Sequence, residues 1–81
     1  MDNKNIKIKC ACCDFLTISE IKETCPVCFW EEDFYQADNM DDANGPNMVS
    51  LNIVKKNFKT FGAIEERFKI YVREPLDEER K

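Results

Sequence analysis

The sequence has 81 residues, which is room for one domain, and a chain this short needs a staple because its core is small. Its 16 acidic residues outnumber its 12 basic residues and give a net charge of −4, which argues against general binding to nucleic acid. The chain contains no histidine, so the commonest general base is missing and we expect no enzyme activity.

The five cysteines supply the candidate staple. Their odd number does not suit a complete disulfide framework, and no apolar signal-peptide core or transmembrane run precedes them. We therefore expect a reducing, cytoplasmic compartment, in which paired Cys-x-x-Cys motifs hold metal more often than they form disulfides.

The first predicted elements are two short strands with a cysteine cluster between them. Residues 6–9 alternate apolar and polar side chains, as a half-exposed strand does, and residues 15–18 are a second candidate. Residues 19–24 then turn the chain toward a second cysteine cluster. This order is typical of a zinc ribbon, in which a metal pins the ends of small hairpins.

Four of the cysteines form two pairs with the same spacing. Cys10 and Cys13 are separated by two residues, eleven residues follow, and Cys25 and Cys28 repeat the spacing. Thiolates are preferred ligands of Zn²⁺, and two such pairs joined by a short loop can place four sulfurs in tetrahedral geometry. We predict one structural Zn²⁺ with no open position for catalysis. The alternative is a redox dithiol, but no βαβ pattern accompanies the motif.

Cys12 is left over, and its neighbour Cys13 is too close in sequence for the two to form a good chelating pair. The simpler interpretation is a small, partly buried residue beside the metal. The alternative is a reactive thiol that lets the site open under oxidation. No basic residue adjoins Cys12 to favour the thiolate, which supports the simpler interpretation.

Residues 29–47 are predicted to be one long connection, rich in aromatic and acidic side chains. Trp30 is expected to cap the small core beside the metal, and the other aromatic residues have the same structural explanation. The functional interpretation is a surface for a basic partner, because aromatic residues are enriched at interface hot spots and clustered carboxylates speed association. Its candidate residues are Glu31, Glu32, Asp33, Phe34, Tyr35, Asp38, Asp41 and Asp42. A calcium loop is rejected because residues 38–42 lack the EF-hand spacing.

One amphipathic helix is predicted over residues 51–60, after the turn at residues 44–47. Ser50 is its expected N-cap and Gly62 its left-handed C-cap. Its apolar face should pack on the ribbon and comprises Leu51, Val54, Phe58 and Phe61. The opposite side, with Lys55, Lys56 and Lys59, is expected to be solvated, since no aromatic or arginine residues interleave with these lysines as in a phosphate-binding surface.

The remaining residues are predicted to complete a single domain over residues 1–75. Residues 63–68 add a helical turn, and residues 69–73 form a last strand or extended segment that ends at Pro75. Residues 76–81 are a polar tail that should fray. The expected fold is a small α/β, zinc-ribbon-like domain with one packed amphipathic helix.

Several of these motifs, in this order, resemble the bacterial cysteine-rich family named for its CPCC motif. They are residues 10–13, 25–33 and 44–47, with Ser50-Leu51, Asn57-Phe58 and Phe61-Gly62, so the resemblance extends from Cys10 to about Pro75. The sequence departs from the family at Ala11, where the family has proline, and at Asp14, where glycine is usual. Asp14 can still adopt a left-handed turn. The resemblance implies a small, soluble, zinc-binding protein.

The expected function is binding to another protein with a basic surface, for which immunity against a basic nuclease toxin is one concrete version. The alternative is a thiol- or metal-responsive protein that uses Cys12. A nucleic-acid adaptor using the three helix lysines is a distant third hypothesis. Nothing in the sequence implies a small-molecule substrate or a membrane.

Overall fold

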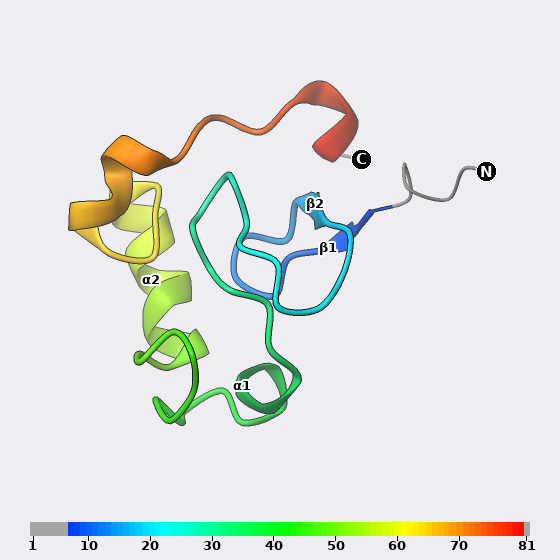
Figure 1. Ribbon diagram of the computed structural model, residues 1–81. Coiled ribbons are helices and arrows are strands. Elements are labelled where there is room, and N and C mark those ends of the chain that lie inside the picture. Colours follow the sequence, from blue (N-terminus) through cyan, green and yellow to red (C-terminus); the bar gives the residue numbers. More distant parts are fainter. Residues whose placement is uncertain (1–6, 81) are drawn as a thin grey trace.

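The computed structural model describes residues 7–80 (Figure 1). In chain order these residues form strands β1 (Ile8–Lys9) and β2 (Leu16–Ile18), helices α1 (Phe34–Asp38) and α2 (Leu51–Phe61), and the 3₁₀ helices η2 (Glu66–Tyr71) and η3 (Asp77–Glu79). No helix of the described part is long and apolar enough to cross a membrane. The fold is a small α/β, zinc-ribbon-like domain, as the sequence predicts.

The predicted hairpin is present, with the first cysteine cluster at its tip. Strands β1 and β2 pair antiparallel, with Ile8 opposite Ile18, and the register shifts at the next residue. The first residue of the predicted strand, Ile6, lies outside the described residues. A second antiparallel contact, between Thr24 and Glu31, brackets the second cysteine cluster in the same way. Each cluster is therefore held between two paired segments.

Helix α1 is absent from the sequence prediction, which treats residues 29–47 as one connection. The helix begins because Asp33 acts as its N-cap, its carboxylate accepting a hydrogen bond from the Gln36 amide at 3.1 Å. The Gln36 side chain is fully buried, so a polar residue anchors the helix. A five-residue helix held by one buried amide has no apolar periodicity to reveal it.

Helix α2 confirms the prediction closely. The Ser50 hydroxyl accepts a hydrogen bond from the Ile53 amide at 3.3 Å, and Gly62 ends the helix with a φ of 79°. Leu51 and Val54 are buried, while the other two members of the predicted apolar face, Phe58 and Phe61, are half-buried. Because this face covers the cysteine-rich part of the chain, α2 completes the core around it.

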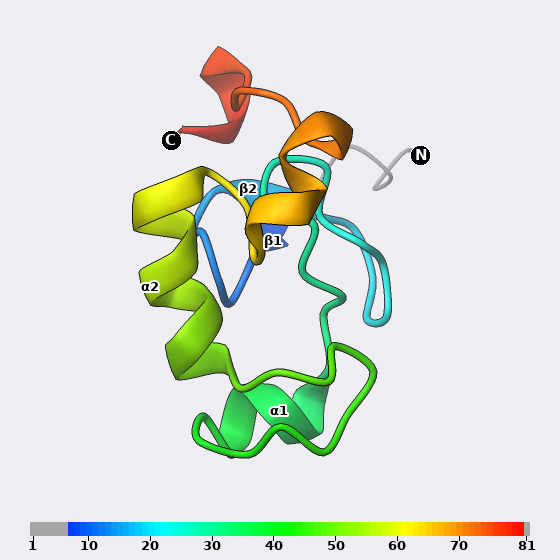
Figure 2. The same cartoon turned by 90° about the vertical axis from the view of Figure 1, so that its left-hand side faces the viewer.

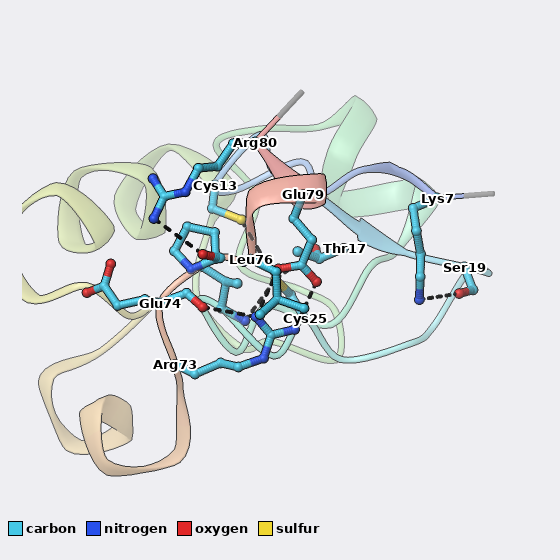
Figure 3. Close-up of polar contacts among 12 residues, drawn as sticks. Lys7, Cys13, Thr17, Ser19, Cys25, Arg73, Glu74, Leu76, Glu79 and Arg80 are labelled. Atoms are coloured by element: carbon cyan, nitrogen blue, oxygen red, sulfur yellow. Dashed lines mark hydrogen bonds and ion pairs between the residues drawn. The ribbon is translucent and has the colours of Figure 1, made fainter. Parts of the chain in front are cut away.

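The C-terminal segment differs from the sequence prediction in two places. Residues 66–71 form η2, so the strand predicted at residues 69–73 is wrong, although Val72 has the extended backbone that the prediction gave as its alternative. Phe68 and Tyr71, three positions apart, both stack on Phe29, which a strand of period two does not allow. Fraying of the tail is also wrong for the described residues, since η3 lies against β2 and Glu79 is buried. Figure 3 shows the Arg73 guanidinium paired with the Glu79 carboxylate.

The core is centred on the cysteines and on Trp30, which is fully buried as predicted. Ile18 and Val54 pack in the same cluster, so the hairpin and α2 share one core. Figure 2 shows that α1 and η2 lie at opposite ends of the molecule, with α2 along one side. The two short helices α1 and η2 are therefore well separated in the fold.

Candidate metal centre

The four predicted ligands converge in the structure. The sulfur atoms of Cys10, Cys13, Cys25 and Cys28 all lie within 4.8 Å of one another, and all four residues are buried. The Sγ–Sγ distances are 3.5 Å between Cys10 and Cys28 and 3.7 Å between Cys13 and Cys25. A tetrahedral site with Zn–S bonds of about 2.3 Å needs sulfurs about 3.8 Å apart, so the cluster fits such an ion.

Two equivalent turns position these sulfurs. The Asp14 amide donates to the Cys10 carbonyl at 2.9 Å, and at the equivalent place the Phe29 amide donates to the Cys25 carbonyl at 2.8 Å. Each turn ends in a left-handed residue, with φ of 67° at Asp14 and 78° at Phe29. Asp14 thus replaces the usual glycine of the motif as expected, because aspartate tolerates this region.

Electrostatics of the cluster call for a cation. Hydrogen bonds from Cys10 and then from the other cysteine thiols lower the pKa of Cys25, which also lies 3.0 Å from the Thr17 hydroxyl. The pKa of Cys28 is raised, first through its hydrogen bond with Cys10. Four thiolates become stable together only when a divalent cation offsets their charge. The four buried cysteines can hold a metal ion.

The first turn is braced by two charged side chains from distant parts of the chain. The Ala11 amide donates to the Glu32 carboxylate at 3.2 Å, and the Lys55 ammonium donates to the carbonyls of Ala11 at 3.0 Å and Cys12 at 3.5 Å. Burial raises the pKa of Glu32 above its usual range. The sequence prediction of a solvated face is therefore wrong for Lys55, whereas Lys56 and Lys59 are exposed as predicted.

Cys12 lies beside the four ligands and is not one of them. It is buried, and its thiol donates to the carbonyl of Val54 at 3.7 Å. Its position matches the simpler interpretation of a small buried residue next to the metal. A reactive role for Cys12 stays a prediction.

The structure divides the predicted partner surface into buried and exposed parts. Glu32 and Asp33 are buried and serve the first turn and the α1 cap, so their inclusion in an exposed surface is wrong. Glu31 is half-buried beside Asn47, whose side chain accepts from the Glu31 amide. The remainder, called here the acidic-aromatic surface, comprises the exposed Phe34, Tyr35, Asp38 and Asp41 and the half-buried Asp42.

Within the acidic-aromatic surface, Phe34 is 72% exposed and Tyr35 is 50% exposed. The Tyr35 hydroxyl donates a hydrogen bond to Asp42, and Asn52 at the start of α2 donates to Asp41 at 2.6 Å. Asp38 is exposed. The surface is therefore fixed in shape by its own contacts, while the two rings remain open to solvent.

Fold and site together define a small zinc-ribbon-like protein with a buried four-cysteine cluster. The chain belongs to the cysteine-rich CPCC family: a family model described as "Cysteine-rich CPCC" matches residues 8–79. No curated protein matches the sequence. The matched range includes η3, in agreement with the packing of that helix against β2.

Proposed function

We propose that the four-cysteine cluster holds one structural Zn²⁺ and that the protein, placed in the cytoplasm, binds a basic protein through the acidic-aromatic surface. Four thiolates fill the coordination shell of Zn²⁺, so the metal contributes to folding and leaves no position for a substrate. The function is accordingly binding and not catalysis. Inhibition of a basic nuclease toxin is one concrete version.

The observation that carries the binding proposal is the exposure of Phe34 in a segment, residues 34–42, that also carries three carboxylates. Phe34 projects from α1, while the helix is anchored by the buried Gln36 on its other side, so the fold does not require the ring. Exposed aromatic rings supply interface hot spots, and the carboxylates of Asp38, Asp41 and Asp42 attract a positive surface. The same residues have no evident use in the metal centre.

Native mass spectrometry of the purified protein tests the metal. We expect one zinc per chain, and unfolding when a chelator removes it. Cys10→Ser should lose the metal, whereas Cys12→Ser, the matched control, should keep it. An intact fold without metal would contradict the proposal. Peroxide-driven zinc release that Cys12→Ser slows would instead support the thiol-responsive alternative.

Co-purification from the source cells, at low and at high salt, tests the partner. We expect a basic protein to be retained at low salt and lost at high salt, because screening weakens charge attraction. Phe34→Ser and Asp38→Lys should each abolish its retention. Glu20→Lys, an equal charge change at an exposed residue after β2, is the matched control. Retention that is insensitive to Phe34→Ser and Asp38→Lys would contradict the assigned surface.

A further inference from the structure

A cleft of about 340 Å³ lies between the tip of the hairpin and α2. The side chains that line it and bear on a ligand are one carboxylate, two aromatic rings and three lysines: Asp14, Phe15, Phe58, Lys55, Lys56 and Lys59. This cleft is called the lysine cleft. Its volume is near the lower end of ligand-binding clefts, which span about 300–1,000 Å³, so it has room for one small unit of a ligand. It shares no residue with the acidic-aromatic surface.

The fold places aromatic rings and an arginine next to the lysines of α2, although the sequence does not. Phe15 precedes β2, and its ring meets the ring of Phe58 on α2 edge to face, with the centroids 6.5 Å apart. The Arg80 guanidinium lies over the Phe15 ring, 5.9 Å from its centroid. Both rings are half-buried and line the cleft, so part of each is open to a ligand. In the folded chain these lysines therefore have the aromatic and arginine neighbours of a nucleic-acid-binding surface.

Charges around the lysine cleft favour an anionic ligand. Lys55 is engaged with the carbonyls of the first cysteine turn, where it offsets part of the negative charge of the zinc-bound centre. Lys56 and Lys59 are exposed and have no ion pair among the described residues. Within the described part of the chain, Asp14 supplies the one carboxylate that lines the cleft. The two exposed lysines and Arg80 outnumber it, so this side of α2 is complementary to phosphate.

We propose that the lysine cleft binds single-stranded nucleic acid. Lys56, Lys59 and Arg80 hold phosphates, and one base stacks against the exposed part of the Phe15 ring. Sites for single strands combine a positively charged groove with aromatic side chains, because every base has a face that can stack. Phosphate and base are neighbours in each nucleotide, as the cations and the ring are in the cleft.

The same chemistry separates a single strand from other anions. A duplex keeps its bases inside the stack, and an acidic peptide has no base, so neither of them makes use of the Phe15 ring. The chain as a whole carries a charge of −4, which confines binding to the lysine cleft and fits the argument against general binding to nucleic acid. The inference does not depend on the proposed function, because it uses none of the same residues.

Fluorescence anisotropy of a labelled oligouridylate, titrated with the purified, metal-bound protein at low salt, tests the phosphate contacts. We expect binding that weakens as salt rises, with a slope of about −2 in log affinity against log salt for three phosphate contacts. Lys56→Gln and Lys59→Gln should each lower the affinity and make the slope shallower by about 0.7. Lys22→Gln is the matched control, since Lys22 is exposed in the turn at residues 19–24, on the other side of the molecule from α2 (Figure 2).

Phe15→Leu tests the ring while it keeps an apolar side chain against the core. This variant should weaken binding at least about fivefold, the effect of losing one stacked base. Phe34→Leu, which removes an exposed ring from the acidic-aromatic surface, is the matched control and should bind like wild type. Circular dichroism of each variant verifies that the fold is retained.

Competing ligands distinguish the single strand from other occupants. Absence of binding at low salt would overturn the proposal, and so would equal binding of a duplex of the same length or of polyglutamate. Displacement of the oligouridylate by uridine monophosphate at equal phosphate concentration would assign the cleft to free nucleotides instead. Phe34→Ser, which should abolish retention of the basic partner, should leave oligouridylate binding unchanged, so this proposal and the proposed function fail separately.

Discussion

Gly45 lies so close to the side chain of Gln36 that a Cβ atom on residue 45 would be 2.5 Å from the Gln36 Cδ atom. The Gln36 amide is fully buried and donates to the carbonyls of Asp42 and Val49 at 3.1 and 3.0 Å. Its oxygen accepts from the side chain of Asn47 at 2.9 Å. One amide thus closes the loop between α1 and α2, and only glycine leaves room for it.

Gly45→Ala should therefore lower the free energy of unfolding by roughly 1–3 kcal/mol, the usual cost of overpacking a rigid site. Urea unfolding of the metal-bound protein measures this, as a lower midpoint with an unchanged slope. In a Gln36→Ala background the obstruction is gone, so the added cost of Gly45→Ala should be much smaller. Equal costs in both backgrounds would show that Gln36 is not the cause.

Gly62 provides the contrasting case. No atom lies within 4 Å of its ideal Cβ position, but its φ is 79°. Gly62→Ala should cost about 1 kcal/mol through backbone strain alone, whether or not Gln36 is present.

Local signals made the metal ligands and α2 predictable from sequence. Cysteine spacing defines both turns, and Ser50 and Gly62 mark the ends of the helix by their own hydrogen bonds and backbone conformation. In contrast, η2 is governed by a tertiary contact, because Phe68 and Tyr71 stack on a ring about 40 positions earlier in the chain. The prediction of a strand at residues 69–73 from the local sequence therefore fails.

The braces of the first cysteine turn were not predictable for the same reason. Glu32 and Ala11 are 21 positions apart, and Lys55 and Ala11 are 44 apart. Neither pair has a sequence signature, since a lysine on a helix and a glutamate in an acidic run are usually solvated. Sequence analysis places Lys55 on a solvated face and Glu32 in a partner surface, and only the contacts of these side chains correct the two predictions.

Lys55 should slow loss of the metal. Its ammonium holds two carbonyls of the first turn and places a positive charge near a centre that is anionic when four thiolates bind Zn²⁺. Lys55→Met should speed zinc transfer to a colorimetric chelator by about tenfold, the effect of losing one charge-assisted hydrogen bond. Lys56→Met, the exposed neighbour, is the matched control. Similar rates for both variants would contradict this role.

Ala11 replaces the proline of the CPCC motif, and its N–H, which proline lacks, donates to the buried Glu32 carboxylate at 3.2 Å. Restoring the motif with Ala11→Pro should cost roughly 1–3 kcal/mol, because Glu32 is left with an unmet buried acceptor. In a Glu32→Ala background the same proline should be neutral or stabilising by about 0.5 kcal/mol, since it restricts the unfolded chain. Urea unfolding of the four proteins measures both values. Destabilisation in both backgrounds would show that the lost hydrogen bond to Glu32 is not the reason for the cost.

The last prediction concerns pH and the C-terminal segment, where the Arg73 guanidinium donates to both oxygens of Glu79 at 2.9 and 2.8 Å (Figure 3). Arg73 lowers the pKa of Glu79 in the folded protein, so the pair stabilises the fold above the unfolded glutamate pKa of about 4.3. That stability is lost as the pH falls through the lower, folded value.

Glu79→Gln should therefore reduce the free energy of unfolding by about 1 kcal/mol at neutral pH, and the difference from wild type should shrink as the pH approaches 4. Proton uptake by the cysteines is common to both proteins and cancels in this difference. Glu78→Gln removes the same charge from an exposed neighbour and should have little effect at any pH. A difference that stays constant from pH 7 to about 4 would show that Glu79 acts by packing and not by its charge.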